Sequence, residues 1–166
     1  MKDLPAAVGP ASGRLRSSAA IETRRYGRAI GAVALPGTVL ALVGPLGAGK
    51  TELAKGVAQG LGITSVVNSP TFVLMNEHAG RLRLFHADAY RLTDPEQALE
   101  AGLLDERQAE GIVVLEWADR LRGLLPEERL ELRIEPDADG SDQRAIEWLA
   151  LGEQHRRLAA AAFGSS

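Results

Sequence analysis

One stretch of the chain combines glycines, a lysine and a threonine at a spacing typical of phosphate binding. Residues 44–51 read G-P-L-G-A-G-K-T and match G-x-x-x-x-G-K-[ST] at every position. In such a loop, backbone N–H groups converge on phosphate oxygens, and the dipole of the following helix adds positive potential. Lys50 is expected to reach the β- and γ-phosphates, and the Thr51 hydroxyl to ligate Mg²⁺. The expected phosphate-contacting residues are Gly44, Leu46, Gly47, Ala48, Gly49, Lys50 and Thr51.

The sequence on both sides of this loop predicts the two elements that such a loop connects. Residues 38–43 form an apolar run rich in β-branched side chains, which is typical of a strand buried on both faces. Residues 52–61 carry apolar side chains at helical spacing and end next to glycine. Lysine occurs only at positions 2, 50 and 55, so its presence at the motif position argues against a chance match. We therefore predict that the chain binds a nucleoside triphosphate.

A second buried strand ends on an acid. Residues 112–115 read I-V-V-L and lead directly into Glu116, which is the Walker B pattern. Ligands of open α/β sheets bind outside the carboxyl ends of the strands, where both the loop and Glu116 would lie. Glu116 could therefore hold Mg²⁺, directly or through water, or orient the attacking water in γ-phosphoryl transfer. The plain alternative is a strand-terminal acid paired with a surface arginine, which the nearby phosphate loop disfavours.

Two further polar segments gain meaning only beside a bound Mg-nucleotide. Residues 86–91, H-A-D-A-Y-R, follow a predicted strand, and Asp88 is their candidate for a second active-site acid. The pairing of His86 with Asp88 also suggests a metal site, but no further ligand set supports zinc. Thr71, in the turn S-P-T, is a candidate switch residue that closes on Mg²⁺ or the γ-phosphate. We predict Glu116, Asp88 and Thr71 as the catalytic residues, and Thr51 and Glu116 as the metal ligands.

The remaining patterns predict one domain over residues 19–163, preceded by a flexible tail over residues 1–18 that has no periodicity. Composition sets further bounds. The chain lacks cysteine, carries a formal charge of −3 and has no apolar run long enough to span a membrane. We expect a cytoplasmic protein whose own surface does not bind nucleic acid sequence-specifically. The predicted helices cover residues 21–35, 93–101, 103–108 and 153–163, and Thr93 is the expected N-cap of the second. Two hairpins are predicted, which pair 73–78 with 81–87 and 129–135 with 143–149.

In this order, the motifs resemble the bacterial TsaE family. The resemblance covers about residues 20–150 and is carried by residues 44–51, N-S-P-T-F at 68–72, H-A-D-A-Y-R-L at 86–92 and V-L-E-W at 114–117. It implies an α/β fold, a three-layer P-loop domain with a mixed sheet, and an ATPase needed to form threonylcarbamoyl-adenosine in tRNA. It also implies ATP and Mg²⁺ as cofactors, the TsaB–TsaD heterodimer as partner, and contact with tRNA only through that complex.

Two positions depart from the family pattern. Pro45 stands where the family usually has aspartate, and Glu52 stands where it has a second threonine or serine. In many P-loop proteins that second hydroxyl contacts the α-phosphate, so Glu52 predicts a weaker or different contact there. Residues 20–23 are a guess for contacts to the base. A small-molecule P-loop kinase, or a nucleotide-gated binding module with incidental hydrolysis, remain alternative functions.

Overall fold

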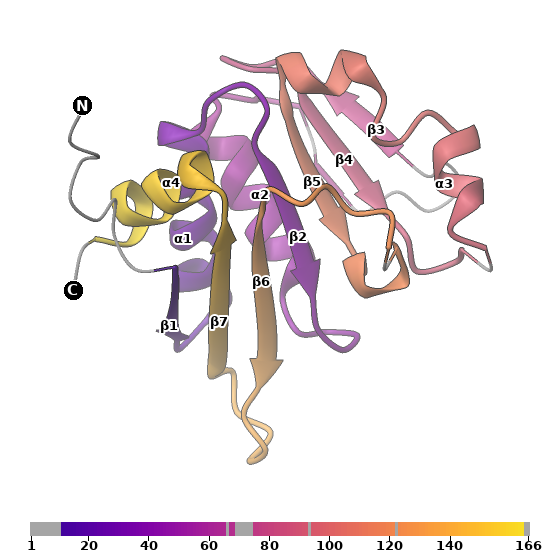
Figure 1. Cartoon of the computed structure of the whole chain (residues 1–166). Helices are drawn as coiled ribbons and strands as arrows, with labels where there is room; N and C mark the ends of the chain where they lie inside the picture. Colours follow the sequence, from indigo (N-terminus) through magenta and orange to yellow (C-terminus); the bar gives the residue numbers. More distant parts are fainter. Residues whose placement is uncertain (1–10, 66, 69–74, 93, 122, 165–166) are drawn as a thin grey trace, which may run out of the picture.

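The computed structural model describes residues 11–65, 67–68, 75–92, 94–121 and 123–164. Seven strands form one mixed sheet of order β1-β7-β6-β2-β5-β4-β3, which lies between helices (Figure 1). The strands are β1 (Ser12–Ser17), β2 (Val39–Val43), β3 (Met75–His78), β4 (Leu84–Asp88), β5 (Ile112–Glu116), β6 (Arg129–Pro136) and β7 (Arg144–Leu151). The helices are α1 (Ala20–Val33), α2 (Lys50–Gly60), α3 (Glu96–Glu100) and α4 (Glu153–Phe163), with 3₁₀ turns η1 (Glu106–Glu110) and η2 (Ala118–Leu121).

The centre of the sheet is parallel and both of its sides are antiparallel. Strand β2 pairs in parallel with β5 and β6, and β4 pairs in parallel with β5. Strands β3, β7 and β1 run antiparallel to their neighbours. The register places Asp88 beside Glu116 and Leu42 beside Glu116. The loop after β2 and the two predicted acids therefore meet at one edge of the sheet, as the expected α/β P-loop architecture requires.

Two apolar clusters cover the two faces of the sheet and form its layers. Helices α1, α2 and α4 pack on one face, through side chains such as Ile30, Leu53 and Leu158. The segment containing α3, η1 and η2 covers the other face over β2, β5 and β4, with Phe85 and Leu115 in its core. This arrangement confirms the predicted three-layer fold with a mixed sheet.

Helices α1 and α2 approach each other closely because glycines face the contact. A Cβ atom built on Gly56 would lie 2.1 Å from the backbone oxygen of Arg24, and one on Gly27 would lie 2.2 Å from the backbone oxygen of Leu53. Neither position can hold a larger residue without a shift of backbone. The backbone of α1 is thereby fixed against the first turns of α2.

The structure corrects the predicted N-terminal tail. Residues Ser12–Ser17 are a strand, β1, which pairs with β7. The local sequence gives little sign of this because only Leu15 alternates with polar residues, and the strand depends on its partner for hydrogen bonds. Gly13 makes room for the indole of Trp148, since a Cβ atom at this position would lie 2.6 Å from the ring. Ser12–Ser17 therefore belong to the folded domain.

Most other predicted elements are present, with shifted ends. The two predicted hairpins are β3–β4 and β6–β7. The helix expected over 103–108 is instead the 3₁₀ turn η1, which starts at Glu106 and is capped by the Asp105 side chain. Helix α3 begins at Glu96 after Pro95, and the predicted cap Thr93 lies outside the described residues. Thr71, the predicted switch residue, also lies outside them.

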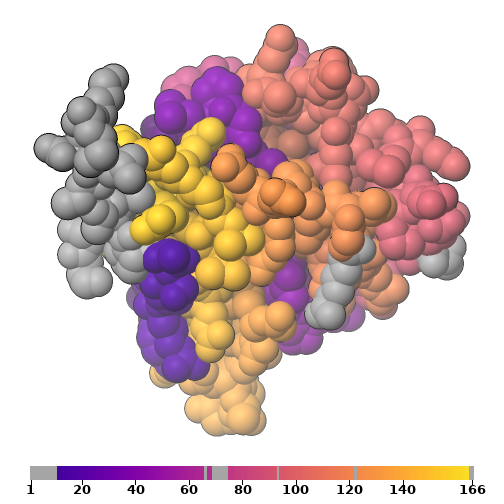
Figure 2. Space-filling view, viewed as in Figure 1, coloured from indigo at the N-terminus to yellow at the C-terminus, as the bar shows by residue number. Residues whose placement is uncertain are grey.

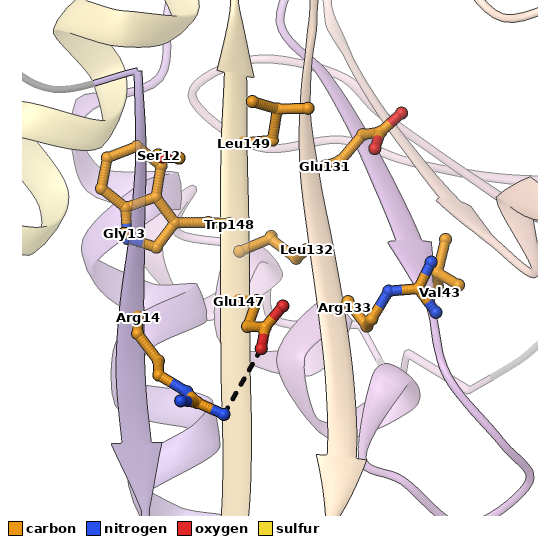
Figure 3. Close-up of a pocket in the computed structure, with 10 residues that line it drawn as sticks. All are labelled: Ser12, Gly13, Arg14, Val43, Glu131, Leu132, Arg133, Glu147, Trp148 and Leu149. Atoms are coloured by element: carbon orange, nitrogen blue, oxygen red, sulfur yellow. Dashed lines mark ion pairs between the residues drawn. The ribbon is translucent and has the colours of Figure 1, made fainter.

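On the second face, β1, β7 and β6 surround a hollow of about 460 Å³, whose lining includes the exposed side chains of Arg14, Arg133 and Glu147. Figure 3 shows Arg14 and Glu147 pointing toward one another there, with a nitrogen to oxygen distance of 3.4 Å. The space-filling view shows the tip of the β6–β7 hairpin protruding from the body of the molecule (Figure 2).

Among the described helices, none is long and apolar enough to cross a membrane.

Candidate functional site

The glycine-rich loop joins β2 to α2, as its sequence predicts. Gly44 follows β2 with a φ of 155°, and a Cβ atom there would lie 2.3 Å from the backbone oxygen of Ile134. Gly49, the residue before α2, has a φ of 115°, a left-handed conformation that non-glycine residues seldom adopt. Both glycines are thus required by geometry. The loop therefore ends at the start of a helix, where backbone N–H groups are available to an anion.

Lys50 lies folded over the loop. Its Nζ atom donates hydrogen bonds to the backbone oxygens of Gly44 at 2.7 Å and Pro45 at 2.8 Å, and lies 4.0 Å from the centroid of the Trp117 ring. Burial lowers the pKa of Lys50, and the charges of nearby acids, first Glu116 and then Asp88, oppose that shift. These two carbonyl oxygens hold the ammonium group at the loop. The group is therefore already in place to bind an anion, whose oxygens would replace the carbonyls as acceptors.

Glu116 is a buried carboxylate with two different donors on its two oxygens. The Thr51 hydroxyl donates to Oε1 at 3.0 Å, and His86 Nε2 lies 2.6 Å from Oε2. The side chains of His86 and Glu116 are 0% and 3% exposed. The other ring nitrogen of His86, Nδ1, is buried and has no hydrogen-bond partner in the described part of the chain. His86 therefore fixes the orientation of the carboxylate that faces Thr51.

Asp88 lies at the end of β4, directly beside Glu116 of β5 in the strand register. Its Oδ1 atom accepts a hydrogen bond from the backbone N–H of Tyr90 at 2.8 Å. Burial raises the pKa of Asp88, and the Tyr90 N–H bond opposes this rise. The charge of Glu116 adds to it. The two acids are close enough to influence each other, which suits a shared cation.

Trp117 forms the wall of the site opposite the loop. It has a φ of 59°, a left-handed conformation that is unusual for a bulky side chain and is found preferentially at functional sites. Its ring lies 4.7 Å from that of Tyr90, centroid to centroid. The Arg120 guanidinium lies 5.3 Å from the Tyr90 ring centroid. The turn after β5 thus directs an aromatic side chain toward Lys50 instead of continuing the strand.

These groups line one pocket of about 330 Å³ at the carboxyl ends of β2, β4 and β5. The structure brings together the predicted loop residues, Asp88 and Glu116, and leaves the predicted Thr71 outside the described residues. Gly44 holds Lys50 through its carbonyl beneath the pocket. The described lining residues are Leu46, Gly47, Ala48, Gly49, Lys50, Thr51, Glu52, Asp88, Tyr90, Glu116 and Trp117.

The two atypical loop positions have distinct surroundings. Pro45 contributes its carbonyl oxygen to Lys50, so the proline preserves a lysine contact that uses backbone alone. Glu52 lines the pocket and forms ion pairs with Arg24 at 2.5 Å and Lys55 at 3.6 Å. Thr23, from the segment guessed to contact the base, is buried and its hydroxyl lies 2.7 Å from that of Ser17.

Sequence reasoning missed three contacts that shape the site. The first is the His86–Glu116 bond, for which the H-x-D spacing gave only a weak signal. The second is Arg144 of β7, whose Nε donates to the backbone oxygen of Ala48 at 3.0 Å and so holds the outside of the loop. No local pattern marks Arg144, since the two residues are 96 positions apart. The third is the pairing of Glu52 with Arg24.

The donor atoms fit a magnesium nucleotide. A hydroxyl and a carboxylate, from Thr51 and Glu116, lie 3.0 Å apart, and oxygen ligands of this kind suit Mg²⁺ when phosphates and water complete the shell. The described residues hold no group of three or more His, Cys, Asp or Glu that could hold a metal ion by itself. Thr51 and Glu116 could hold Mg²⁺ where phosphate and water oxygens complete its shell.

Comparisons with known proteins point to the same family. The model for "Threonylcarbamoyl adenosine biosynthesis protein TsaE" matches residues 17–146. A Bacillus subtilis protein named "tRNA threonylcarbamoyladenosine biosynthesis protein TsaE" is 43% identical over 82% of this chain and 85% of its own length. A Treponema pallidum protein of the same name is 39% identical over 80% of this chain and 98% of its own length.

A solved structure extends the similarity to the fold. The crystal structure of Bacillus subtilis YdiB superposes with a TM-score of 0.75 at 34% identity. The superposition covers 91% of this chain and 93% of the other. The family model, the related sequences and the solved structure each match most of this chain. On these grounds, the chain belongs to the TsaE family.

Proposed function

We propose that this protein is a Mg²⁺-dependent ATPase that supports formation of the threonylcarbamoyl group on adenosine 37 of tRNA, acting with a TsaB–TsaD heterodimer. The family is involved in tRNA threonylcarbamoyladenosine biosynthesis, as the names of its members state. The observation that carries the proposal is the convergence of Lys50, Thr51, Asp88 and Glu116 on one pocket beside a glycine loop. A lysine, a hydroxyl and carboxylates beside such a loop are the kinds of group that phosphoryl transfer uses.

The four side chains divide three tasks in this proposal, which are phosphate binding, metal binding and positioning of the attacking water. Lys50 exchanges its bonds to the loop carbonyls for bonds to the β- and γ-phosphates. Thr51 and Glu116 hold Mg²⁺, which when bound neutralises phosphate charge. Glu116, oriented by His86, also positions the attacking water, and Asp88 assists it as a second acid.

The lining of the pocket supports the expectation that the isolated protein turns over ATP slowly. Leu46 is 80% exposed and Tyr90 is 44% exposed, although both line the pocket. Water is therefore not excluded from the nucleotide side of the site, and exclusion of water strengthens the electrostatic contacts of a transition state. A partner covering this opening would provide it, which is consistent with hydrolysis that depends on TsaB–TsaD.

Turnover measurements test the proposal. Steady-state release of phosphate from MgATP is measured for the protein alone and with TsaB–TsaD. We expect little or no hydrolysis alone and clear stimulation by the heterodimer. Turnover that the heterodimer does not change would contradict the assigned partnership. Phosphorylation of a free metabolite, without any partner, would instead support the small-molecule kinase alternative.

A further inference from the structure

The charges that line the phosphate pocket are poorly suited to an anion. Among its described lining residues are three carboxylates, those of Glu52, Asp88 and Glu116, and one cation, Lys50. Under the proposed function, Mg²⁺ accounts for Glu116 and its neighbour Asp88. Glu52 has no such role, yet it lies one residue beyond Thr51 in the first turn of α2. A carboxylate in this place repels a triphosphate unless its charge is offset.

Two cations outside the pocket lining contact that carboxylate. Arg24 Nε lies 2.5 Å from Glu52 Oε2, and Lys55 Nζ lies 3.6 Å from Glu52 Oε1. Arg24 comes from α1, whereas Lys55 is one turn along α2. The side chains of Arg24 and Glu52 are 39% and 27% exposed, so the pair is only partly screened by water. The three side chains together carry one net positive charge.

Arg24 is held in this position by the packing of its backbone. The close approach of α1 and α2 places the backbone oxygen of Arg24 only 2.1 Å from the position that a Cβ atom on Gly56 would take. Gly56 lies one turn beyond Glu52 on α2. The arginine therefore needs to order only its side chain to pair with Glu52, which reduces the entropic cost of the pair.

We propose that Arg24 is a determinant of nucleotide affinity that acts through Glu52. It neutralises the acid in the first turn of α2, and it thereby allows the triphosphate to approach that turn. Lys55, being farther from the carboxylate, has a smaller share in the same role. This inference rests on the proposed function, because it requires the pocket to bind a phosphate chain.

A double-mutant cycle tests the inference in the full-length protein. Dissociation constants for MgATP are measured by calorimetry for Arg24→Gln, Glu52→Gln and the double variant, at low and high salt. We expect Arg24→Gln to raise the constant about tenfold at low salt, and less at high salt, because screening weakens repulsion. In the double variant the constant is expected to return to within about threefold of the wild-type value, since the unpaired acid is gone.

Matched controls separate this effect from others. Arg28→Gln removes the same charge from the next turn of α1 and is expected to leave MgATP binding unchanged. The melting temperature of each nucleotide-free variant shows whether α1 still packs on α2. If Arg24→Gln fails to fold, Glu52→Gln carries the test alone, with an expected affinity equal to or tighter than wild type.

Three results would overturn the inference. The first is that Arg24→Gln binds MgATP as tightly as Arg28→Gln does. The second is that the double variant binds as weakly as Arg24→Gln. The third is that Glu52→Gln binds more weakly than wild type. Failure of the proposed function gives a different result. In that case the wild-type protein does not bind MgATP, or Lys50→Ala binds it equally well. If binding depends on Lys50 but the double-mutant cycle shows no coupling between Arg24 and Glu52, only the role of Arg24 is contradicted, and the proposed function stands.

Discussion

The site beside the glycine loop and the open face of the sheet both hold basic and acidic side chains, but they differ in burial. At the pocket, His86 and Glu116 are 2.6 Å apart and almost fully buried. On the open face, Arg14 and Glu147 are 3.4 Å apart with side chains 67% and 59% exposed. Exposed pairs contribute little to stability because water and salt screen them. Breaking a buried pair leaves an uncompensated polar group, which is costly.

This difference shows which charges have a positioning role. On the open face, a side chain can be lost and its partner becomes hydrated instead. In the pocket, the loss of one group leaves the next without its partner, because hydrogen bonds run from Thr51 through Glu116 to His86. The open face has the larger hollow, about 460 Å³ against about 330 Å³, so size alone does not identify the functional site.

The largest expected effect comes from removing the cation of the pocket. Lys50→Ala should raise the dissociation constant for MgATP by about 100-fold or more, because each charge-assisted bond to phosphate contributes about 1.5–3 kcal/mol. Calorimetric titration measures this. Lys55→Ala removes a lysine five residues further along and serves as control, with a much smaller loss. Equal affinities of Lys50→Ala and wild type would remove the phosphate role from the loop.

Removing the buried acid should separate binding from hydrolysis. Glu116→Ala is expected to bind MgATP nearly as well as wild type while kcat falls about 100-fold or more, since the group acts mainly on the reaction step. Phosphate release in the presence of TsaB–TsaD gives kcat, and calorimetry gives affinity. Glu147→Ala on the open face is the matched loss of a strand acid and should change neither. Normal hydrolysis by the Glu116 variant would show that the Walker B assignment is wrong.

A smaller effect is expected at the residue that holds this acid. His86→Leu should lower kcat about tenfold or more with little change in KM for MgATP, because it removes the donor that orients Glu116. His86→Gln should recover most of that loss, since its amide N–H can replace Nε2–H. The same phosphate-release assay distinguishes them. A glutamine variant as impaired as the leucine variant would indicate a packing role for His86 instead of a positioning one.

The smallest effect is expected on the open face. Arg14→Gln should change the free energy of unfolding by less than about 0.5 kcal/mol, because the ion pair is exposed. Urea denaturation measures the change, and MgATP affinity should stay at the wild-type value. A loss of affinity in this variant would connect the open face to the pocket and remove the contrast between them.

Local sequence patterns predict those parts of the fold that depend on a single continuous segment of the chain. The apolar runs before Gly44 and Glu116 predicted β2 and β5, and the glycine motif predicted the loop between β2 and α2. Contacts between distant segments were not predictable in this way. The His86–Glu116 bond depends on the register of β4 on β5, and the Arg144 contact depends on how the β6–β7 hairpin meets the loop. Strand β1 was missed because its hydrogen-bond partners lie in β7.

A crystal structure with Mg²⁺ and a non-hydrolysable ATP analogue tests the proposed nucleotide site most directly. We predict that the phosphates occupy the loop between β2 and α2 and that Lys50 Nζ leaves the oxygens of Gly44 and Pro45 to bind them. Mg²⁺ is predicted at Thr51, on the side facing Glu116. An analogue bound elsewhere, for example in the hollow over β1, β7 and β6, with Lys50 still bonded to the loop carbonyls, would contradict the proposed site.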